Sequence, residues 1–235
     1  MKKKMMASLL VGSAVVGASL APLSAQATTT GNTPVQVEFG GGVLPDHDNT
    51  GNGNNVDPDP TKPNTDFDLL AVPKLLNFLP VKIGEDLSAI NLDAASIIAP
   101  SVMVGDVRGT KEGWHVTGEI GEMSNGSDKL TGEINFTSKL YYAVYNEVAG
   151  YYAEHLPLEG IDIADDPTAP SLIGTNMEIG GGATVIMNAS TGKGQGAWSS
   201  RLRDISLNVT TPMEQLKKGA YTGNITWNLV AGPSI

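Results

Sequence analysis

Three tryptophans, Trp114, Trp198 and Trp227, are the side chains best suited to bind a polysaccharide. An indole ring can cover the apolar face of a sugar, but only if the ring is exposed. Trp114 and Trp227 lie where apolar and polar residues alternate, on the side shared with Val, Ile and Leu, so we expect both rings in the core. Trp198 follows the glycine-rich turn 191–196, and loops often carry binding residues. Trp198 is therefore the better candidate for an exposed, ligand-binding ring.

Asp106 and Arg108 form a second candidate site, because residues two apart lie on the same side of a strand. Their charges allow a charge-assisted pair, either with each other or with a ligand. A structural ion pair that fixes the loop before Trp114 is the favoured interpretation, since close charged pairs are often structural. Direct binding of a ligand or a partner by Asp106 and Arg108 is the alternative.

The stretch 46–57 imitates a calcium loop, in which alternating oxygen ligands surround the ion and a glycine makes the sharp turn. Asp57 stands where such loops hold a bidentate glutamate, and no helical pattern flanks the stretch. We expect a solvated linker here, and we predict neither a metal site nor a cofactor. The residues that match the calcium pattern are Asp46, Asp48, Thr50, Gly51 and Asp57.

Catalytic chemistry has little support in this sequence, which holds three histidines, His47, His115 and His155, and none of them within a known catalytic motif. We predict no catalytic residue and no enzyme. A pair of carboxylates across a cleft could still hydrolyse a polysaccharide, and this enzyme class is the last-ranked alternative. The acidic residues that could supply such a pair are Glu154, Glu159, Asp162, Asp165 and Asp166.

The N-terminus has the three parts of a secretory signal peptide: lysines at 2–4, an apolar run over 7–20, and the small-residue site 25–27. We expect cleavage before Thr28, which leaves 12 basic against 25 acidic residues. A surface this acidic repels nucleic acid, so nucleic acid is not an expected partner. The apolar run is too short to span a bilayer, and we expect no transmembrane segment in the mature chain. With no cysteine, stability has to come from the core.

Composition divides the remaining chain at about residue 65. Residues 40–65 are rich in Gly, Asn, Asp and Pro and have few apolar side chains to bury, which predicts a linker. Residues 34–39 (PVQVEF) alternate apolar with polar and could form a strand that reaches the main sheet. The predicted organisation is a signal peptide over 1–27, an N-terminal extension and disordered linker over 28–65, and a β domain over 66–235.

Alternation with a period of two dominates the chain after residue 65, over 114–120, 133–137, 205–209 and 221–229. Half-buried strands separated by Gly, Asn, Asp and Pro are typical of two antiparallel sheets packed face to face. We therefore predict an all-β fold, an antiparallel, immunoglobulin-like β-sandwich. Residues 140–156 are rich in Tyr and Ala, and the sequence leaves open whether they form a short helix or an irregular insertion.

Two segments together resemble the paired motifs of the WxL domain, a family of surface modules in Gram-positive cell walls. The distal motif, Tyr-x3-Leu-Thr-Trp-x-Leu-x3-Pro, is matched by Tyr221, Ile225, Thr226, Trp227, Leu229 and Pro233, with Ile in place of the first Leu. The proximal motif is matched by Val107-Arg108-Gly109 after Asp106, and then by Gly113-Trp114-His115-Val116, with Val116 at the Leu position. Both exchanges are apolar for apolar and preserve the buried face.

The resemblance implies a secreted protein of the cell wall and cell surface that binds peptidoglycan or another wall polymer without a covalent link. It also implies partners among other WxL proteins and WxL-interacting surface proteins. The sequence agrees in one respect, since it contains no LPxTG-type sorting signal. Asp106, Arg108 and Trp198, or the polar row Asn224, Thr226 and Asn228, would then be the wall- or partner-binding residues.

The favoured hypothesis is a structural subunit of a surface assembly, held on the wall by its β domain. An adhesin that binds host extracellular matrix is the alternative, since an acidic surface suits basic patches on matrix proteins.

Overall fold

The computed structural model describes residues 31–47, 53–96, 98–156 and 163–233. The predicted signal peptide lies outside the described residues. The chain divides into two compact units, Met1–Glu38 and Phe39–Ile235. In the first unit, residues 31–38 have no regular secondary structure and are exposed. The strand predicted over 34–39 is therefore absent from the structure, because the sheets of the second unit pair without it.

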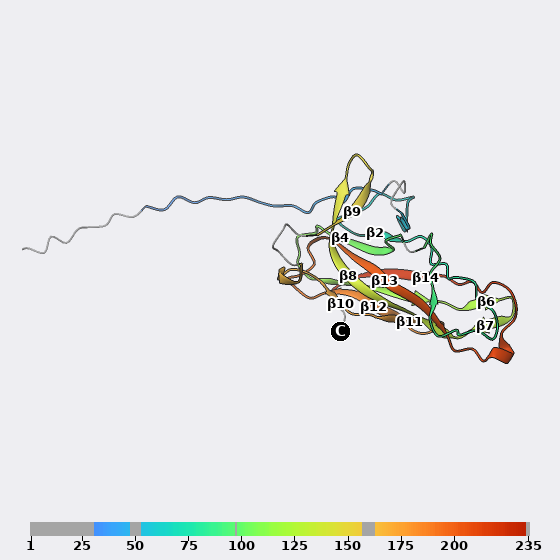
Figure 1. The fold of residues 1–235 in the computed structure, drawn as a ribbon. Coiled ribbons are helices and arrows are strands. Elements are labelled where there is room, and N and C mark those ends of the chain that lie inside the picture. Colours follow the sequence, from blue (N-terminus) through green and yellow to red (C-terminus); the bar gives the residue numbers. More distant parts are fainter. Residues whose placement is uncertain (1–30, 48–52, 97, 157–162, 234–235) are drawn as a thin grey trace, which may run out of the picture. The chain divides into compact units, whose positions relative to one another are not determined.

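The second unit is built almost entirely from antiparallel strands, and the predicted all-β fold is confirmed (Figure 1). The larger sheet has the order β1 (Asn55–Val56), β2 (Phe67–Pro73), β4 (Ser101–Asp106), β13 (Gly196–Val209), β8 (Gly132–Asn146) and β11 (Asn176–Glu178), with β3 (Ile90–Asn91) beside β13 and β9 (Tyr151–His155) beside β8. The second sheet has the order β10 (Ser171–Leu172), β12 (Thr184–Ala189), β5 (Trp114–Ile120) and β14 (Ile225–Ala231). A hairpin of β6 (Met123–Asn125) and β7 (Asp128–Leu130) and two single-turn 3-10 helices, η1 (Ile163–Asp165) and η2 (Met213–Gln215), complete the described elements.

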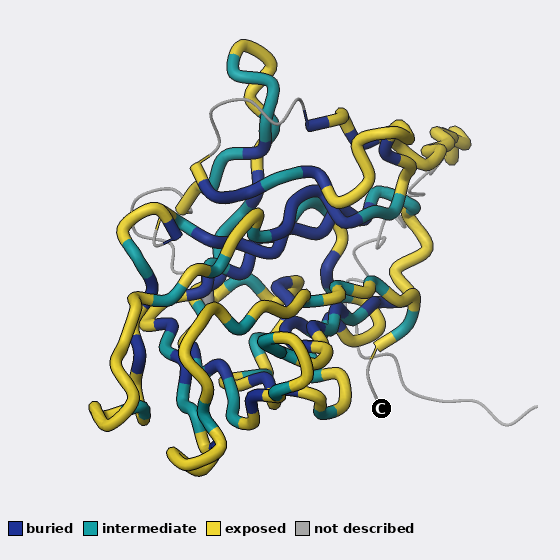
Figure 2. Tube along the Cα trace, turned by 90° about the vertical axis from the view of Figure 1, so that its right-hand side faces the viewer, coloured by how far each residue is buried: buried dark blue, intermediate teal, exposed yellow. Residues whose placement is uncertain are grey.

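The main core lies between these two sheets and takes side chains from both. In β5, Trp114, Val116 and Ile120 are buried while His115, Thr117 and Glu119 face outward, as the alternation predicts. Val104 of β4 and Leu202 of β13 belong to the same buried cluster. Figure 2 shows the buried residues gathered along the strands and the exposed ones along the connecting loops. Burial of one face of each sheet therefore fixes the register of the strands.

The segment 140–156, whose structure the sequence leaves open, is β-structure. Strand β8 continues to Asn146, turns back, and pairs with β9 in antiparallel register. The Asn146 carboxamide oxygen accepts the N–H groups of Val148 and Ala149, and Gly150 adopts a φ of +71° to close the turn. Tyrosine favours strands, so the tyrosines of this segment fit the strands that it forms.

A second, smaller cluster of buried residues packs on the other face of the larger sheet. It contains Leu70 of β2, Met103 of β4 and Tyr152 of β9, together with Leu44. The Tyr152 hydroxyl donates to the Pro45 carbonyl at 2.8 Å, and β1 pairs with β2. The described part of 40–65 is thus partly packed rather than wholly a linker, because Leu44 and a few buried polar groups hold it on the sheet.

Within the described residues, the structure contains no helix that is long and apolar enough to cross a membrane.

Candidate functional site

The two WxL-type motifs lie on neighbouring strands of the second sheet. Strand β14 pairs with β5 along its whole length in antiparallel register, from Ile225 opposite Ile120 to Ala231 opposite Trp114. The Gly232 N–H donates to the Gly113 carbonyl at 3.0 Å and extends the contact beyond the strands. Residues more than a hundred positions apart in the sequence therefore form one continuous two-stranded surface, while Pro233 follows β14 and is exposed.

Trp114 is a structural residue, since none of its surface is exposed. Its indole N–H donates to the Gly194 carbonyl at 3.0 Å, so the one polar atom of the ring is satisfied inside the core. A Cβ on Gly194 would lie 2.5 Å from the indole nitrogen, and Gly194 has a φ of +77°. The glycine-rich turn is thus shaped to let its backbone approach Trp114 closely.

Trp227 is only half-buried, because β14 is the edge strand of its sheet. With Tyr221 and Ile225 it lines an open groove of about 360 Å³. The segment 73–78, which follows β2, lines the same groove, together with Ile120 and Ile134 of the core. The two motif tryptophans therefore have different surroundings, and only Trp227 borders an open space.

The outward face of β5 and β14 is a row of polar side chains. Thr226 lies opposite Glu119, Asn228 opposite Thr117, and both β14 residues are exposed. At the end of the row, His115 Nδ1 lies 2.9 Å from the Gly232 carbonyl oxygen. Ile225, Trp227 and Leu229 point inward, so this face carries mainly hydroxyl, amide and carboxylate groups, with the 44% exposed Val230 opposite His115 as an apolar exception.

Asp106 and Arg108 form a buried ion pair at the entry to the proximal motif. Arg108 Nη2 and Nε donate to the two Asp106 carboxylate oxygens at 2.8 and 2.9 Å, and these side chains are 12% and 2% exposed. The hydrogen bond to Asp106 raises the pKa of Arg108. Arg108 also pairs with Glu112 and donates to the Gly113 carbonyl, and its guanidinium lies 3.7 Å from the ring centre of Phe67.

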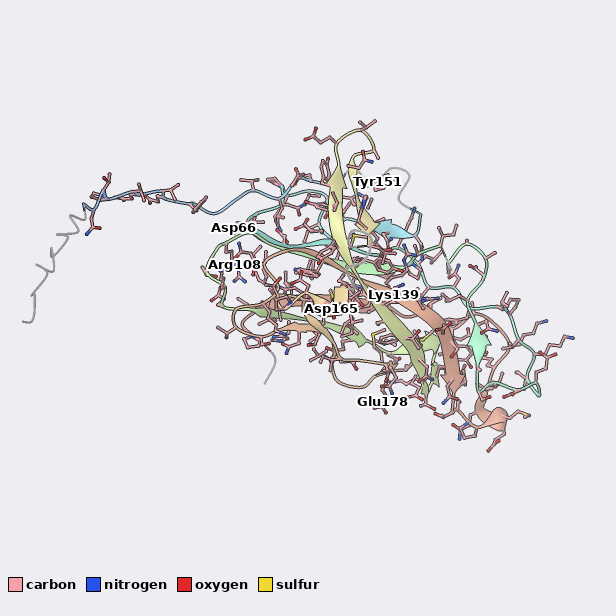
Figure 3. All side chains as sticks on the ribbon, turned by 60° about the vertical axis from the view of Figure 1, so that its left-hand side comes forward. Asp66, Arg108, Lys139, Tyr151, Asp165 and Glu178 are labelled. Atoms are coloured by element: carbon pink, nitrogen blue, oxygen red, sulfur yellow. The ribbon has the colours of Figure 1, made fainter. Side chains whose placement is uncertain are left out.

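These contacts support the structural interpretation of the pair, because the Asp106 carboxylate is enclosed and the guanidinium is shared among partners. Figure 3 labels Arg108 together with Asp66, whose charge also acts on it. The network closes the loop between β4 and β5 and so positions Trp114.

The expectation that Trp198 is exposed is wrong, because the ring is only 2% exposed. The glycine-rich turn ends before it, and Trp198 lies in the central strand β13, opposite Val104 of β4 and Tyr142 of β8. Its indole N–H donates to the Gln195 carbonyl at 3.2 Å, and its ring packs against Tyr142 with centroids 5.0 Å apart. Trp198 has no surface to offer a polysaccharide.

Sequence reasoning missed a polar cluster on the outer face of the larger sheet. The Glu154 carboxylate accepts the hydroxyls of Ser101 and Ser199 at 2.6 and 2.7 Å and pairs with Arg201. The Arg201 guanidinium lies 4.7 Å from the ring centre of Tyr141. The contributing strands β4, β9 and β13 are far apart in the sequence, so no local pattern could have revealed this cluster.

The calcium-like stretch is only partly within the described residues, which omit 48–52. Asp57 accepts the N–H of Asp59 at 2.8 Å, and an Asp46 oxygen accepts the N–H of Asn64. Burial raises the pKa of Asp57. The part of the chain that the structure describes contains no group of three or more histidine or acidic side chains that could hold a metal.

Comparison with known families gives one match. The sequence profile of the WxL domain, described as surface and cell wall-binding, matches residues 26–233. This is nearly the whole chain and includes much of the stretch ahead of residue 66, where the sequence predicts an extension and a linker. No curated protein sequence and no solved structure gives a significant match. The profile match includes both motifs, and the structure pairs the two strands that carry them. The chain belongs to the WxL domain family of surface, cell-wall-binding proteins.

Proposed function

We propose that this protein is secreted, binds peptidoglycan without a covalent link, and serves there as a structural subunit of a surface complex with other WxL and WxL-interacting proteins. One observation carries the wall-binding part of the proposal. The two motif strands pair so that they display one row of polar side chains, with the exposed Thr226 and Asn228 on β14 and the half-buried Thr117 and exposed Glu119 on β5.

The chemistry of this row suits the glycan strands of the wall. Hydroxyl, carboxamide and carboxylate groups can exchange hydrogen bonds with the hydroxyl and N-acetyl groups of a polysaccharide. Both strands are fixed by the core on their inner side, so the row is preorganised and little conformational entropy is lost on binding.

Charge favours the glycan over polyanionic wall polymers. With the predicted signal peptide removed, the chain has 12 basic and 25 acidic residues, and like charges repel. Glu119 lies within the polar row itself. Hydrogen bonding to an uncharged sugar avoids this repulsion.

Co-sedimentation of residues 28–235 with insoluble peptidoglycan, stripped of proteins and of secondary polymers, tests the proposal. We expect saturable binding by the wild type and at least about tenfold weaker binding by the double variant Thr226→Ala/Asn228→Ala, since two hydrogen-bonding groups are lost. The matched control is Thr137→Ala/Asn176→Ala, which removes the same two residue types from exposed positions on the other sheet. Equal binding by wild type and both variants would place the contact elsewhere, and no pelleting at all would overturn direct binding.

A further inference from the structure

Strand β14 has one edge without a strand partner among the described residues. The sheet order places it last, after β5, and each of its residues from Ile225 to Ala231 is paired on the β5 side. The N–H and C=O groups that point away from β5 are a template for a further strand.

The groove beside this edge opens onto the core. Ile120, Met123 and Ile134 contribute to its lining, and Trp227 borders it. The segment 73–78 lines the groove as well and contributes Leu76 and Phe78. The apolar lining beside the free edge of β14 thus combines the buried Ile120 and Ile134 with the half-buried Met123 and Trp227.

The residues 34–39 have the pattern that such an edge would accept. Val35, Val37 and Phe39 lie on one side of an extended chain and are 93%, 74% and 87% exposed, while Gln36 and Glu38 lie on the other side. None of these residues belongs to a strand. Large apolar side chains at every second position are typical of a strand with one buried face. Because all three are exposed here, they are typical of a segment that binds another surface.

We propose that residues 34–39 of one copy of this chain add to the free edge of β14 in a second copy, as an antiparallel strand. Six residues span about 20 Å and the seven of β14 about 23 Å, so the two strands match in length. Val35, Val37 and Phe39 enter the groove, and Gln36 and Glu38 extend the polar face that carries Thr226 and Asn228. Pro34 stands at the first position of the new strand, where proline is tolerated.

The tether favours a second copy over the chain's own edge. The Gly42 N–H donates to the Val107 carbonyl, at the start of the loop that ends at Gly113. The Gly113 carbonyl in turn accepts the N–H of Gly232, just beyond the C-terminal end of β14. Residues 34–39 precede Gly42 in the chain, so if they paired with β14 of their own chain, Phe39 would lie at this C-terminal end of β14. The segment would then run parallel to the strand. Every pair of named strands in the described structure is antiparallel, and parallel pairing is slightly less stable per residue. A segment from another molecule is free to choose the antiparallel direction.

The resulting assembly is head-to-tail, because each copy gives its own segment and keeps its own groove open for another. This inference deepens the assembly role under the proposed function by naming a second copy as a partner, but it does not depend on wall binding. The added strand occupies the edge of β14 and leaves the outward face accessible.

Sedimentation velocity of residues 28–235 over a wide concentration range, without cell wall, tests the inference. We expect the mass to grow with concentration, and we expect the double variant Val35→Ser/Val37→Ser to associate roughly a hundredfold more weakly, since it loses two buried apolar side chains. The matched control is Gln36→Ser/Glu38→Ser, which changes the other side of the same strand and should leave assembly intact. All four positions are exposed in the single chain, so neither variant should disturb folding.

A synthetic peptide of residues 31–41 provides a second measurement, because it should dissociate the assemblies and shift the fluorescence of Trp227, the one tryptophan that is not buried. Equal assembly by both double variants would overturn the inference, as would a monomeric wild type at every concentration. A monomeric wild type that is destabilised by Val35→Ser/Val37→Ser would show that the segment pairs with its own chain. Wall binding is measured separately, and Val35→Ser/Val37→Ser should still pellet with peptidoglycan.

Discussion

Arg108→Ala should cost this protein a large part of its stability. The substitution leaves the Asp106 carboxylate, whose side chain is 2% exposed, without the guanidinium that donates to both of its oxygens. Removing one partner of a buried ion pair typically costs about 3–5 kcal/mol, because the remaining charge is desolvated and uncompensated. The contact with Phe67 is lost as well. Since a domain has only about 5–15 kcal/mol of stability, the effect should be unmistakable.

Urea unfolding followed by tryptophan fluorescence measures this change, because Trp114 and Trp198 move from the core into water. An exposed ion pair provides the control: Lys62 Nζ lies 2.6 Å from Asp59 Oδ2, and the two side chains are 77% and 50% exposed. Lys62→Ala should leave the urea midpoint of unfolding unchanged. In a double-mutant cycle with Asp106→Ala, the double variant should lose less stability than the sum of the two single variants' losses, by about 2 kcal/mol or more. A loss below about 1 kcal/mol for Arg108→Ala, or additive losses, would refute the account of the buried pair.

Three further predictions concern the loop, the pH dependence and metal ions. Gly113→Ala should destabilise the fold by at least about 2 kcal/mol in the same urea assay, because a Cβ would lie 2.3 Å from the Ala189 carbonyl oxygen at a φ of +83°, whereas Gly109→Ala, also at positive φ but in open space, should cost about 1 kcal/mol. Hydrogen bonds from Thr168 and from the Tyr142 hydroxyl lower the pKa of Asp166, so its contribution to stability is present above the unfolded pKa of about 3.9 and is lost as the pH falls through the folded value. Asp166→Asn should flatten this part of the stability profile, and an unchanged profile would contradict it. Adding calcium or a chelator should leave the melting temperature unchanged. A higher melting temperature in calcium would show that the protein binds the ion and would favour residues 46–57 as the site.

Strands that bury one face could be read from the sequence because their side chains alternate. Trp114, Val116 and Ile120 show this in β5, and their register follows from burial. The pairing of β5 with β14 could not be derived from either strand alone, since nothing local joins residues so far apart; it was the family resemblance that linked the two motifs.

The residues whose burial or pairing differs from the prediction have one physical cause in common: tertiary pairing overrides the local sequence pattern. Trp198 follows a glycine-rich turn, but β4 and β8 enclose it on both sides. Leu44 lies in a stretch rich in Gly, Asn, Asp and Pro, yet its burial, the Tyr152 hydrogen bond to Pro45 and backbone hydrogen bonds to Val107 and Thr65 hold its segment on the sheet. Conversely, Val35 and Val37 alternate as a strand does, but have no strand beside them.

The central claim, that the outward face of β5 and β14 contacts the wall, is tested most directly by mapping amide chemical shifts while soluble peptidoglycan fragments are added to the isotope-labelled protein. The account predicts the largest changes at Thr117, Thr226 and Asn228, with little change on the outer face of the larger sheet around Lys139. Shifts confined to that opposite face, or saturable binding that leaves the motif strands unperturbed, would contradict it.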